Sequence, residues 1–272
     1  MDIPLGKQTS YPSHYDAGLL FPVSRAENRG VIGVAAPAPF EGYDHWRAYE
    51  LSWLDSVGMP QVGMADILVP CSSPNLIESK SMKLYFNSLN QHRFPSREHL
   101  SDCIRRDLST VAGINVGVEV FDLDSHRSPL VLQPSNAQLL DRIQVTEPVF
   151  EPSAGMLLRA SSATIDATYV SHLFRSNCPV TSQPDWGSIV IEYRGPEPDN
   201  AALLRYILSY RLHEGFHEHC VERIFVELLA AFSPEHLVVS INFTRRGGLE
   251  INPIRSLHAM AEMRPLARFV RQ

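Results

Sequence analysis

The chain has 272 residues, of which 44% are hydrophobic and 20% charged, and its formal net charge is −6. This composition is typical of a globular protein with one large domain or two ordinary ones, and it argues against disorder. The acidic balance gives no broad electrostatic reason to bind nucleic acid or an acidic membrane. The first residues lack the pattern of a secretory signal, and no apolar segment is long enough to span a bilayer.

The four cysteines are widely spread and form no CxxC pair. They therefore indicate reduced thiols rather than a disulfide framework. Cys103 and Cys220 lie on apolar helix stripes, where a small buried thiol is ordinary. We expect a cytoplasmic protein with no membrane partner and no direct nucleic-acid partner.

The first half of the chain is predicted to contain three strands and two helices. Apolar residues are spaced for strands at about 46–54, 60–69 and 114–122, and for helices at about 79–91 and 97–111. Ser96 is the candidate N-cap of the second helix, and Gly113 is the candidate glycine that ends it.

The second half repeats the pattern with one additional strand. Strands are predicted at about 165–175, 187–194, 236–244 and 249–254, and helices at 199–212 and 217–232. Asp199 precedes the first of these helices, and Pro234 follows the second, as helix limits often do.

Both halves follow the order strand, strand, helix, helix, strand. This repetition predicts an α+β fold, a duplicated module with two helices on one face of an antiparallel sheet. The stretch between the halves carries four prolines and little periodicity. We therefore expect an N-terminal module at 1–124, a Pro-rich linker at 125–155 and a C-terminal module at 156–272.

The segment HEGFH, residues 213–217, matches the HExxH pattern of zinc hydrolases. In that pattern two histidines one helical turn apart bind zinc, and the glutamate activates water. Here Gly215 interrupts the motif, and the preceding helix is predicted to end near Arg211. A polar turn opening the next helix is the preferred interpretation, and a zinc-dependent hydrolase using His213, Glu214 and His217 is the alternative.

Two other segments could receive an anionic ligand, although a Rossmann GxGxxG and a P-loop are both absent. LIESKSMKLY, residues 76–85, places Ser79, Lys80 and Lys83 where an apolar helix begins. TRRGGLEI, residues 244–251, sets two arginines beside two glycines, which offer charge and open N–H groups to a phosphate. A capped helix and a basic hairpin turn are the plainer interpretations.

The segment RSNCPVTSQPDWG, residues 175–187, places Cys178 in a run of turn-forming polar residues. Free cysteine is more often a small core residue. A catalytic role needs a thiolate and a nearby proton carrier, for which Asp185 is the candidate. An unreactive loop cysteine remains the alternative on this segment alone.

Taken together, the segments LIESKSMKLY, SNCPVTSQPDWG, HEGFHEHCVERIF and RRGGLEINP resemble the NADPH-dependent 7-cyano-7-deazaguanine reductases, the nitrile reductases of queuosine biosynthesis. The motifs follow the family's order, and the resemblance extends over nearly the whole chain. ESKS in the first half and the cysteine in the second resemble the long, two-module form. The resemblance implies tandem tunnelling-fold modules, no metal and a homodimer.

The resemblance also assigns residues to roles. It implies that Cys178 adds to the nitrile to form a thioimide and that Asp185 is the general acid, while NADPH delivers two hydrides in turn. The implied contacts to the 7-deazaguanine nitrile are Ile77, Glu78, Ser79, His217 and Glu218. The implied contacts to NADPH are Ser79, Lys80, Arg246 and Gly247. A catalytically silent ligand-binding relative and a thiol nitrilase remain further alternatives.

Overall fold

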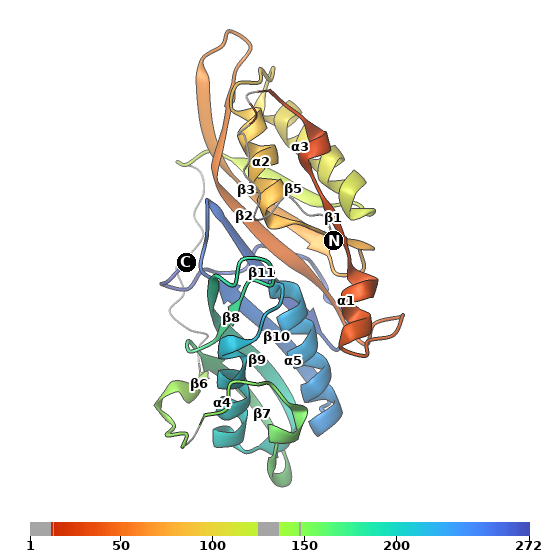
Figure 1. Cartoon of the computed structure of the whole chain (residues 1–272), viewed down its shortest axis with the longest axis vertical. Coiled ribbons are helices and arrows are strands. Elements are labelled where there is room, and N and C mark those ends of the chain that lie inside the picture. Colours follow the sequence, from red (N-terminus) through yellow and green to blue (C-terminus); the bar gives the residue numbers. More distant parts are fainter. Residues whose placement is uncertain (1–11, 13, 125–135, 147) are drawn as a thin grey trace.

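The computed structural model describes residues 12, 14–124, 136–146 and 148–272. A nine-stranded sheet runs through both halves in the order β5-β3-β2-β11-β10-β9-β7-β6, with β8 paired to β9. Figure 1 shows the first half at the top of the elongated molecule and the second half below it. Within the described part of the chain, no helix is long and apolar enough to cross a membrane.

The first half contains the predicted elements in the predicted order. They are β2 (Glu41–Leu54), β3 (Pro60–Pro70), α2 (Ser79–Leu89), α3 (Arg97–Ala112) and β5 (Gly117–Phe121). The apolar faces of both helices pack on this part of the sheet and enclose a core that includes Trp46, Ile67 and Leu108. Ser96 caps α3, and Gly113 ends it with a φ of 74° in the left-handed region, as predicted.

The second half repeats this arrangement. Its elements are β7 (Arg159–Ser171), β8 (Arg175–Asn177), β9 (Pro184–Pro198), α4 (Asn200–Ser209), α5 (His217–Phe232), β10 (His236–Phe243) and β11 (Leu249–Ser256). Asp199 caps α4 by accepting a hydrogen bond from the N–H of Ala202. Helices α4 and α5 cover β7, β9 and β10 around a second apolar core. The duplicated α+β architecture is therefore confirmed.

The two halves join edge to edge. Strand β11 pairs antiparallel with β2 over the registers Leu249–Ala48 to Ser256–Glu41, so one sheet carries both helix pairs. Because β2 is the first strand of the main sheet along the chain and β11 is the last, this pairing brings segments about two hundred residues apart into contact. The join sets the place where residues of both halves can meet.

Several boundaries differ from the prediction. The strand expected at 165–175 is two strands, β7 and β8, and the strand expected from 187 begins at Pro184. The short elements β1 (Pro22–Ser24), α1 (Arg25–Val31), β4 (Asn75–Ile77) and β6 (Gln138–Leu139) were not predicted. They are too short for a periodic pattern to reveal, and β1 and β4 pair with each other outside the main sheet.

The module boundaries stay a prediction. Residues 125–135 and 147 of the expected linker lie outside the described residues. Elsewhere in that segment, Leu140 is fully buried against the core of the second half, with Ile143 and Val145 packed beside it. These contacts come from isolated apolar residues, which carry no period along the sequence.

Candidate active site

One cavity is lined by residues of both halves. Eight of the residues singled out from the sequence line it, namely Ile77, Glu78, Ser79, Cys178, Asp185, His217, Glu218 and Arg246. Lys80 and Gly247 do not line this cavity. The structure therefore brings together four motifs that are separated by up to 170 residues in the sequence.

Cys178 directly follows β8 at the start of a tight turn. Its N–H donates to the carbonyl of Gln183 at 2.9 Å, and its carbonyl accepts from the N–H of Ser182 at 2.9 Å. The residue is only 7% exposed. Residues 179–184 of the turn are exposed, whereas Cys178 itself is buried and lines the cavity.

Asp185 lies in β9, inside the predicted loop segment but within a strand. Its Oδ1 lies 2.8 Å from Arg246 Nη1, and its Oδ2 lies 3.3 Å from His217 Nε2. Burial by itself would raise the pKa of Asp185, but His217, Arg246 and Lys83 together hold it below the ordinary value. The side chain is thus a carboxylate at neutral pH and can accept a proton.

His217 and Glu218 are the first two residues of α5. The His217 ring stacks on Phe243 with ring centroids 3.8 Å apart, and its Nδ1 has no hydrogen-bond partner among the described residues. Burial, and then the charge of Asp44, raise the pKa of Glu218 to about 7, although His217 and Arg25 act in the opposite direction. This carboxyl can therefore gain or lose a proton near neutrality.

Glu78 is the N-cap of α2. Its carboxylate oxygens accept hydrogen bonds from the N–H groups of Lys80 at 2.8 Å and Ser81 at 2.7 Å. The residue is fully buried, so these bonds fix its carboxylate in the cavity wall between Ile77 and Ser79. Glu78 and Glu218 thus present one acidic side chain from each half.

Two family models match the chain. One is described as "Nitrile reductase, 7-cyano-7-deazaguanine-reductase N-term" and matches residues 11–120, and the other is described as "QueF-like protein" and matches residues 184–262. The protein named NADPH-dependent 7-cyano-7-deazaguanine reductase in Bordetella avium is 50% identical over 255 residues, 94% of this chain and 93% of that protein. The chain belongs to this reductase family.

Two further relatives carry the same name. The protein of Chromohalobacter salexigens is 48% identical over 99% of this chain and 96% of that protein. The protein of Burkholderia vietnamiensis is 49% identical over 93% of this chain and 92% of that protein. The likeness therefore spans both halves, as the four motifs require.

The residues assigned to NADPH fit a phosphate-bearing cofactor. Arg246 Nη1 is buried and has no hydrogen-bond partner among the described residues, although it forms the ion pair with Asp185. Gly247 follows in the turn between β10 and β11, where it is exposed and has a φ of 56°, in the left-handed region that favours glycine. Ser79 and Lys80 are the first residues of α2, where Glu78 already accepts from the N–H groups of Lys80 and Ser81, so the Ser79 and Lys80 side chains are the candidate contacts to a phosphate.

Gly247 lines a second cavity together with Lys83. A Cβ at Gly247 would lie only 3.1 Å from Lys83 Cε, so glycine allows this close approach. The pKa of Lys83 is lowered, because burial and the charge of Arg246 outweigh the opposite effects of Glu78, Asp185 and Cys178. The sequence indicated Lys83 as a possible contact to an anion, but the family resemblance did not assign it to the substrate or to NADPH; it lies four residues after Ser79, on the same helix face.

The HEGFH segment does not form a zincin site. A 3-10 turn ends at Leu212, and α5 begins only at His217, so His213 lies outside that helix. His213 and Glu214 line a separate cavity, whereas His217 lines the active-site cavity. Across the described ranges, no group of three or more acidic, His or Cys side chains is arranged for a metal. The interpretation as a turn opening the next helix is confirmed.

Proposed function

We propose that the chain catalyses its family's reaction, the NADPH-dependent four-electron reduction of the nitrile of 7-cyano-7-deazaguanine to 7-aminomethyl-7-deazaguanine, a step of queuosine biosynthesis. The observation that carries the proposal is the single cavity that Cys178, Asp185 and Glu218 all line. The Cys178 thiol is suited to addition to a nitrile, with the Asp185 carboxylate beside it to move protons. The Glu218 carboxyl is suited to recognition of a guanine-like edge.

Cys178 is the nucleophile. A nitrile carbon is electrophilic but resists direct hydride attack, and addition of the thiolate converts it into the C=N bond of a thioimide. The sulfur electron pair forms the S–C bond, while one nitrile π pair moves to nitrogen, which takes a proton. Enclosure of Cys178 in the cavity wall limits the access of water to this adduct.

Asp185 carries the protons. Its lowered pKa makes it a carboxylate before the reaction, so it can accept the thiol proton of Cys178. It then returns that proton to the nitrile nitrogen as the thioimide forms. His217, 3.3 Å from Asp185, is placed to exchange protons with it in the later steps. Asp185 therefore acts first as a base and then as the general acid.

The 7-deazaguanine ring presents adjacent N–H donors, which a carboxylate can accept together. Glu218 is placed for this contact, and the stretch from Ile77 to Ser79 lies in the wall beside it. An analogue without these donors leaves a buried carboxylate unpaired, which costs about 1–3 kcal/mol or more. The site therefore distinguishes its substrate from analogues without these N–H donors by hydrogen bonding as well as by shape.

Two molecules of NADPH, bound in turn, would each supply one hydride to the former nitrile carbon. After the first hydride adds to the thioimide, the S–C bond breaks, which releases the Cys178 thiolate and leaves an imine for the second hydride. Ser79, Lys80, Arg246 and Gly247 would hold each NADPH, the first three through their side chains. Because Arg246 also pairs with Asp185, one side chain connects the cofactor contacts with the proton carrier.

We also propose that the working form is a cytoplasmic homodimer built from sheet edges, with no direct contact to nucleic acid. Strands β5 and β6 stand at the two ends of the sheet order, and an edge strand offers unpaired backbone groups to a second chain. Mass measured by light scattering tests the dimer. A monomer at all working concentrations would contradict it.

The decisive assay measures NADPH consumed per molecule of 7-cyano-7-deazaguanine, using chelator-treated protein. We expect two NADPH per nitrile and the aminomethyl product by mass spectrometry. A thiol nitrilase would release a carboxylic acid without consuming NADPH, and a zinc hydrolase would lose its activity with the chelator. A silent relative would bind the nitrile and leave it unchanged.

A further inference from the structure

His217 is held at the active-site cavity by two side chains of different kinds. Its Nε2 lies 3.3 Å from Asp185 Oδ2, and its ring stacks on Phe243 with centroids 3.8 Å apart and ring planes at 14°. The other ring nitrogen, Nδ1, is buried and has no hydrogen-bond partner among the described residues. The orientation of this imidazole therefore depends on Asp185 at its edge and on Phe243 at its face.

Two neighbouring strands place Phe243 beside Asp185. Phe243, the last residue of β10, pairs with Gly187 of β9, and Asp185 lies two residues before Gly187 on the same strand. Side chains two residues apart along a strand point to the same face of the sheet. Phe243 and Asp185 therefore both lie on the face that α4 and α5 cover. His217, as the first residue of α5, lies over the ring of one and beside the carboxylate of the other.

Phe243 is itself fixed on several sides. The residue is 1% exposed, and the Phe174 ring packs edge-on against it with centroids 5.8 Å apart. The paired register of β10 and β11 stops short of Phe243, where Pro253 gives β11 a residue with no N–H to donate. Side chains take over there, because the Phe243 N–H donates to Asn252 Oδ1 at 3.1 Å and its carbonyl accepts from Gln272 Nε2 at 3.2 Å. The ring is thus a rigid support for its neighbour.

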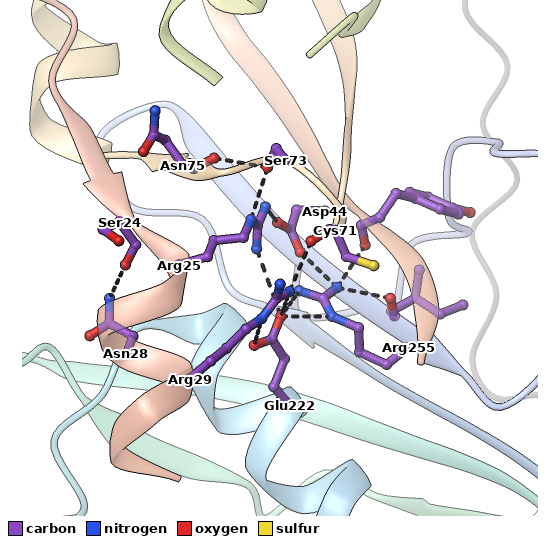
Figure 2. A network of polar contacts seen from close by, with 12 residues as sticks. Ser24, Arg25, Asn28, Arg29, Asp44, Cys71, Ser73, Asn75, Glu222 and Arg255 are labelled. Atoms are coloured by element: carbon purple, nitrogen blue, oxygen red, sulfur yellow. Dashed lines mark hydrogen bonds and ion pairs between the residues drawn. The ribbon is translucent and has the colours of Figure 1, made fainter. Parts of the chain in front are cut away.

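Helix α5, which carries His217, is fixed separately by a buried ionic network. Figure 2 shows its members converging from separate elements, namely Arg25 and Arg29 of α1, Asp44 of β2, Glu222 of α5 and Arg255 of β11. All except Arg29 are at most 2% exposed. Glu222 accepts from Arg29 Nη2 at 2.7 Å and from Arg255 Nη2 at 2.8 Å, which holds α5 to α1 and β11. The helix therefore places the backbone of His217, and Phe243 adds the orientation of its side chain.

That orientation matters because the reaction needs a second proton at the substrate nitrogen. Asp185 delivers the thiol proton of Cys178 as the thioimide forms, and the first hydride then leaves an electron pair on nitrogen, which takes another proton. His217 can reload Asp185 by giving up the proton on Nε2 while Nδ1 takes one from solvent, so the charge of the ring is unchanged. This transfer requires that Nε2 face Asp185 Oδ2, as it does here.

We propose that Phe243 is a positioning residue, whose ring keeps the His217 imidazole turned with Nε2 toward Asp185, so that Asp185 regains a proton after the thioimide has formed. The inference rests on the proposed function, because it assigns Phe243 a role in that reaction. Phe243 does not line the active-site cavity, so it acts through His217 and not on the substrate. Loss of its ring should slow the steps after adduct formation and spare the addition of Cys178, since Asp185 takes the thiol proton itself.

The first measurement records the His217 ring protons by nuclear magnetic resonance in full-length protein labelled at histidine, with His217→Ala to assign the signals. Protons stacked over a phenyl face are shifted upfield, so Phe243→Leu should move these signals downfield. Phe232→Leu is the matched control, because it loses the same ring from the same core, where Phe232 packs on Tyr193, and it should leave the His217 signals in place. Signals that do not move in Phe243→Leu would overturn the proposal.

The second measurement follows two rates in the same variants at saturating nitrile. Intact-protein mass spectrometry without NADPH gives the rate of adduct formation, and NADPH consumption gives the rate of turnover. Phe243→Leu should lower turnover by about 10-fold or more, because a small displacement of a catalytic group is enough to cost about 10²-fold. Adduct formation should stay near the wild-type rate, and Phe232→Leu should match wild type in both. A loss of adduct formation equal to the loss of turnover would contradict the proposed role.

A double-mutant cycle separates positioning from packing. If Phe243 acts through His217, Phe243→Leu should cost little further turnover in the His217→Ala background, whereas independent effects would add. Equal losses in both backgrounds overturn the proposal. Should Phe243→Leu not fold, Phe243→Met, which fills the space flexibly but has no flat face, takes its place in the same cycle.

The same assays separate this inference from the proposed function. A wild-type protein that consumes no NADPH with the nitrile would overturn the proposed function, and the role of Phe243 with it. An active wild type whose variants lose turnover additively would overturn the role of Phe243 alone.

Discussion

Arg246 Nη1 lies 2.8 Å from Asp185 Oδ1, so the turn between β10 and β11 is electrostatically joined to the first residues of β9. The contact connects the residue assigned to cofactor phosphate with the residue assigned to proton transfer. It also explains why a buried acid such as Asp185 is ionised, since Arg246, with His217 and Lys83, outweighs the effect of burial on its pKa. Changes at either residue should therefore affect the other.

Replacing Cys178 by alanine should abolish turnover and leave NADPH binding largely intact, because only the nucleophile is lost. Incubation with the nitrile in the absence of NADPH should add the nitrile's mass to the wild-type chain and none to the variant. Intact-protein mass spectrometry checks both statements. Cys103→Ser, which keeps a donor toward Asp107 in the other core, is the control and should retain activity. Full activity of Cys178→Ala would remove the covalent mechanism.

Asp185→Asn should fold and should reduce the nitrile about 10²–10⁴-fold more slowly, the usual contribution of a positioned proton carrier. The amide cannot accept the thiol proton, so adduct formation itself should be slow. Single-turnover kinetics and circular dichroism separate the chemical effect from misfolding. Asp166→Asn, an exposed change on β7, should match wild type. A wild-type rate in Asp185→Asn would assign the proton transfer to another group.

Arg246→Gln should weaken NADPH binding by about 10-fold or more, since a charge-assisted hydrogen bond contributes about 1.5–3 kcal/mol. Fluorescence titration of NADPH without the nitrile measures this directly. Arg245→Gln removes the same charge from the adjacent residue, whose guanidinium stacks on Tyr49 at 4.4 Å, and should bind NADPH normally. Equal losses in the two variants would indicate a general charge effect instead of a contact.

Glu222→Gln should destabilise the protein by about 3–5 kcal/mol, the usual result of removing one partner from a buried ion pair. Urea unfolding at neutral pH measures the change. Glu235→Gln breaks an exposed pair with Arg194 and should cost less than about 1 kcal/mol. Similar values for both variants would contradict the role of the buried network in stability.

The pH dependence of unfolding provides a separate test of Glu222. Burial would raise its pKa, but Arg255, Arg29 and Arg25 lower it to about 2, against an ordinary value of 4.5. The unfolded state therefore binds the proton first, so this stabilisation is present above about pH 4.5 and is lost as the pH falls toward 2. Unfolding free energies of wild type should fall over this window more steeply than those of Glu222→Gln. Parallel curves would exclude the assigned linkage.

The local pattern of the sequence was sufficient to predict the main helices and strands and to indicate the chemistry of the motifs. Alternation and helical spacing predicted the strands and helices of both halves, and Ser96, Gly113 and Asp199 marked helix limits correctly because capping depends on adjacent residues. The motifs around Cys178 and Glu78 indicated a family because each motif is a continuous stretch of sequence that can be recognised without the fold.

Tertiary structure alone decided where those segments meet and how their groups ionise. Glu78 and Glu218 line one cavity only because β11 pairs with β2, a contact between distant segments that no local period encodes. Likewise, the raised pKa of Glu218 follows first from its burial and then from the charge of Asp44 on β2. Desolvation and Coulomb interactions depend on distances in space, which the order of residues in the chain does not contain.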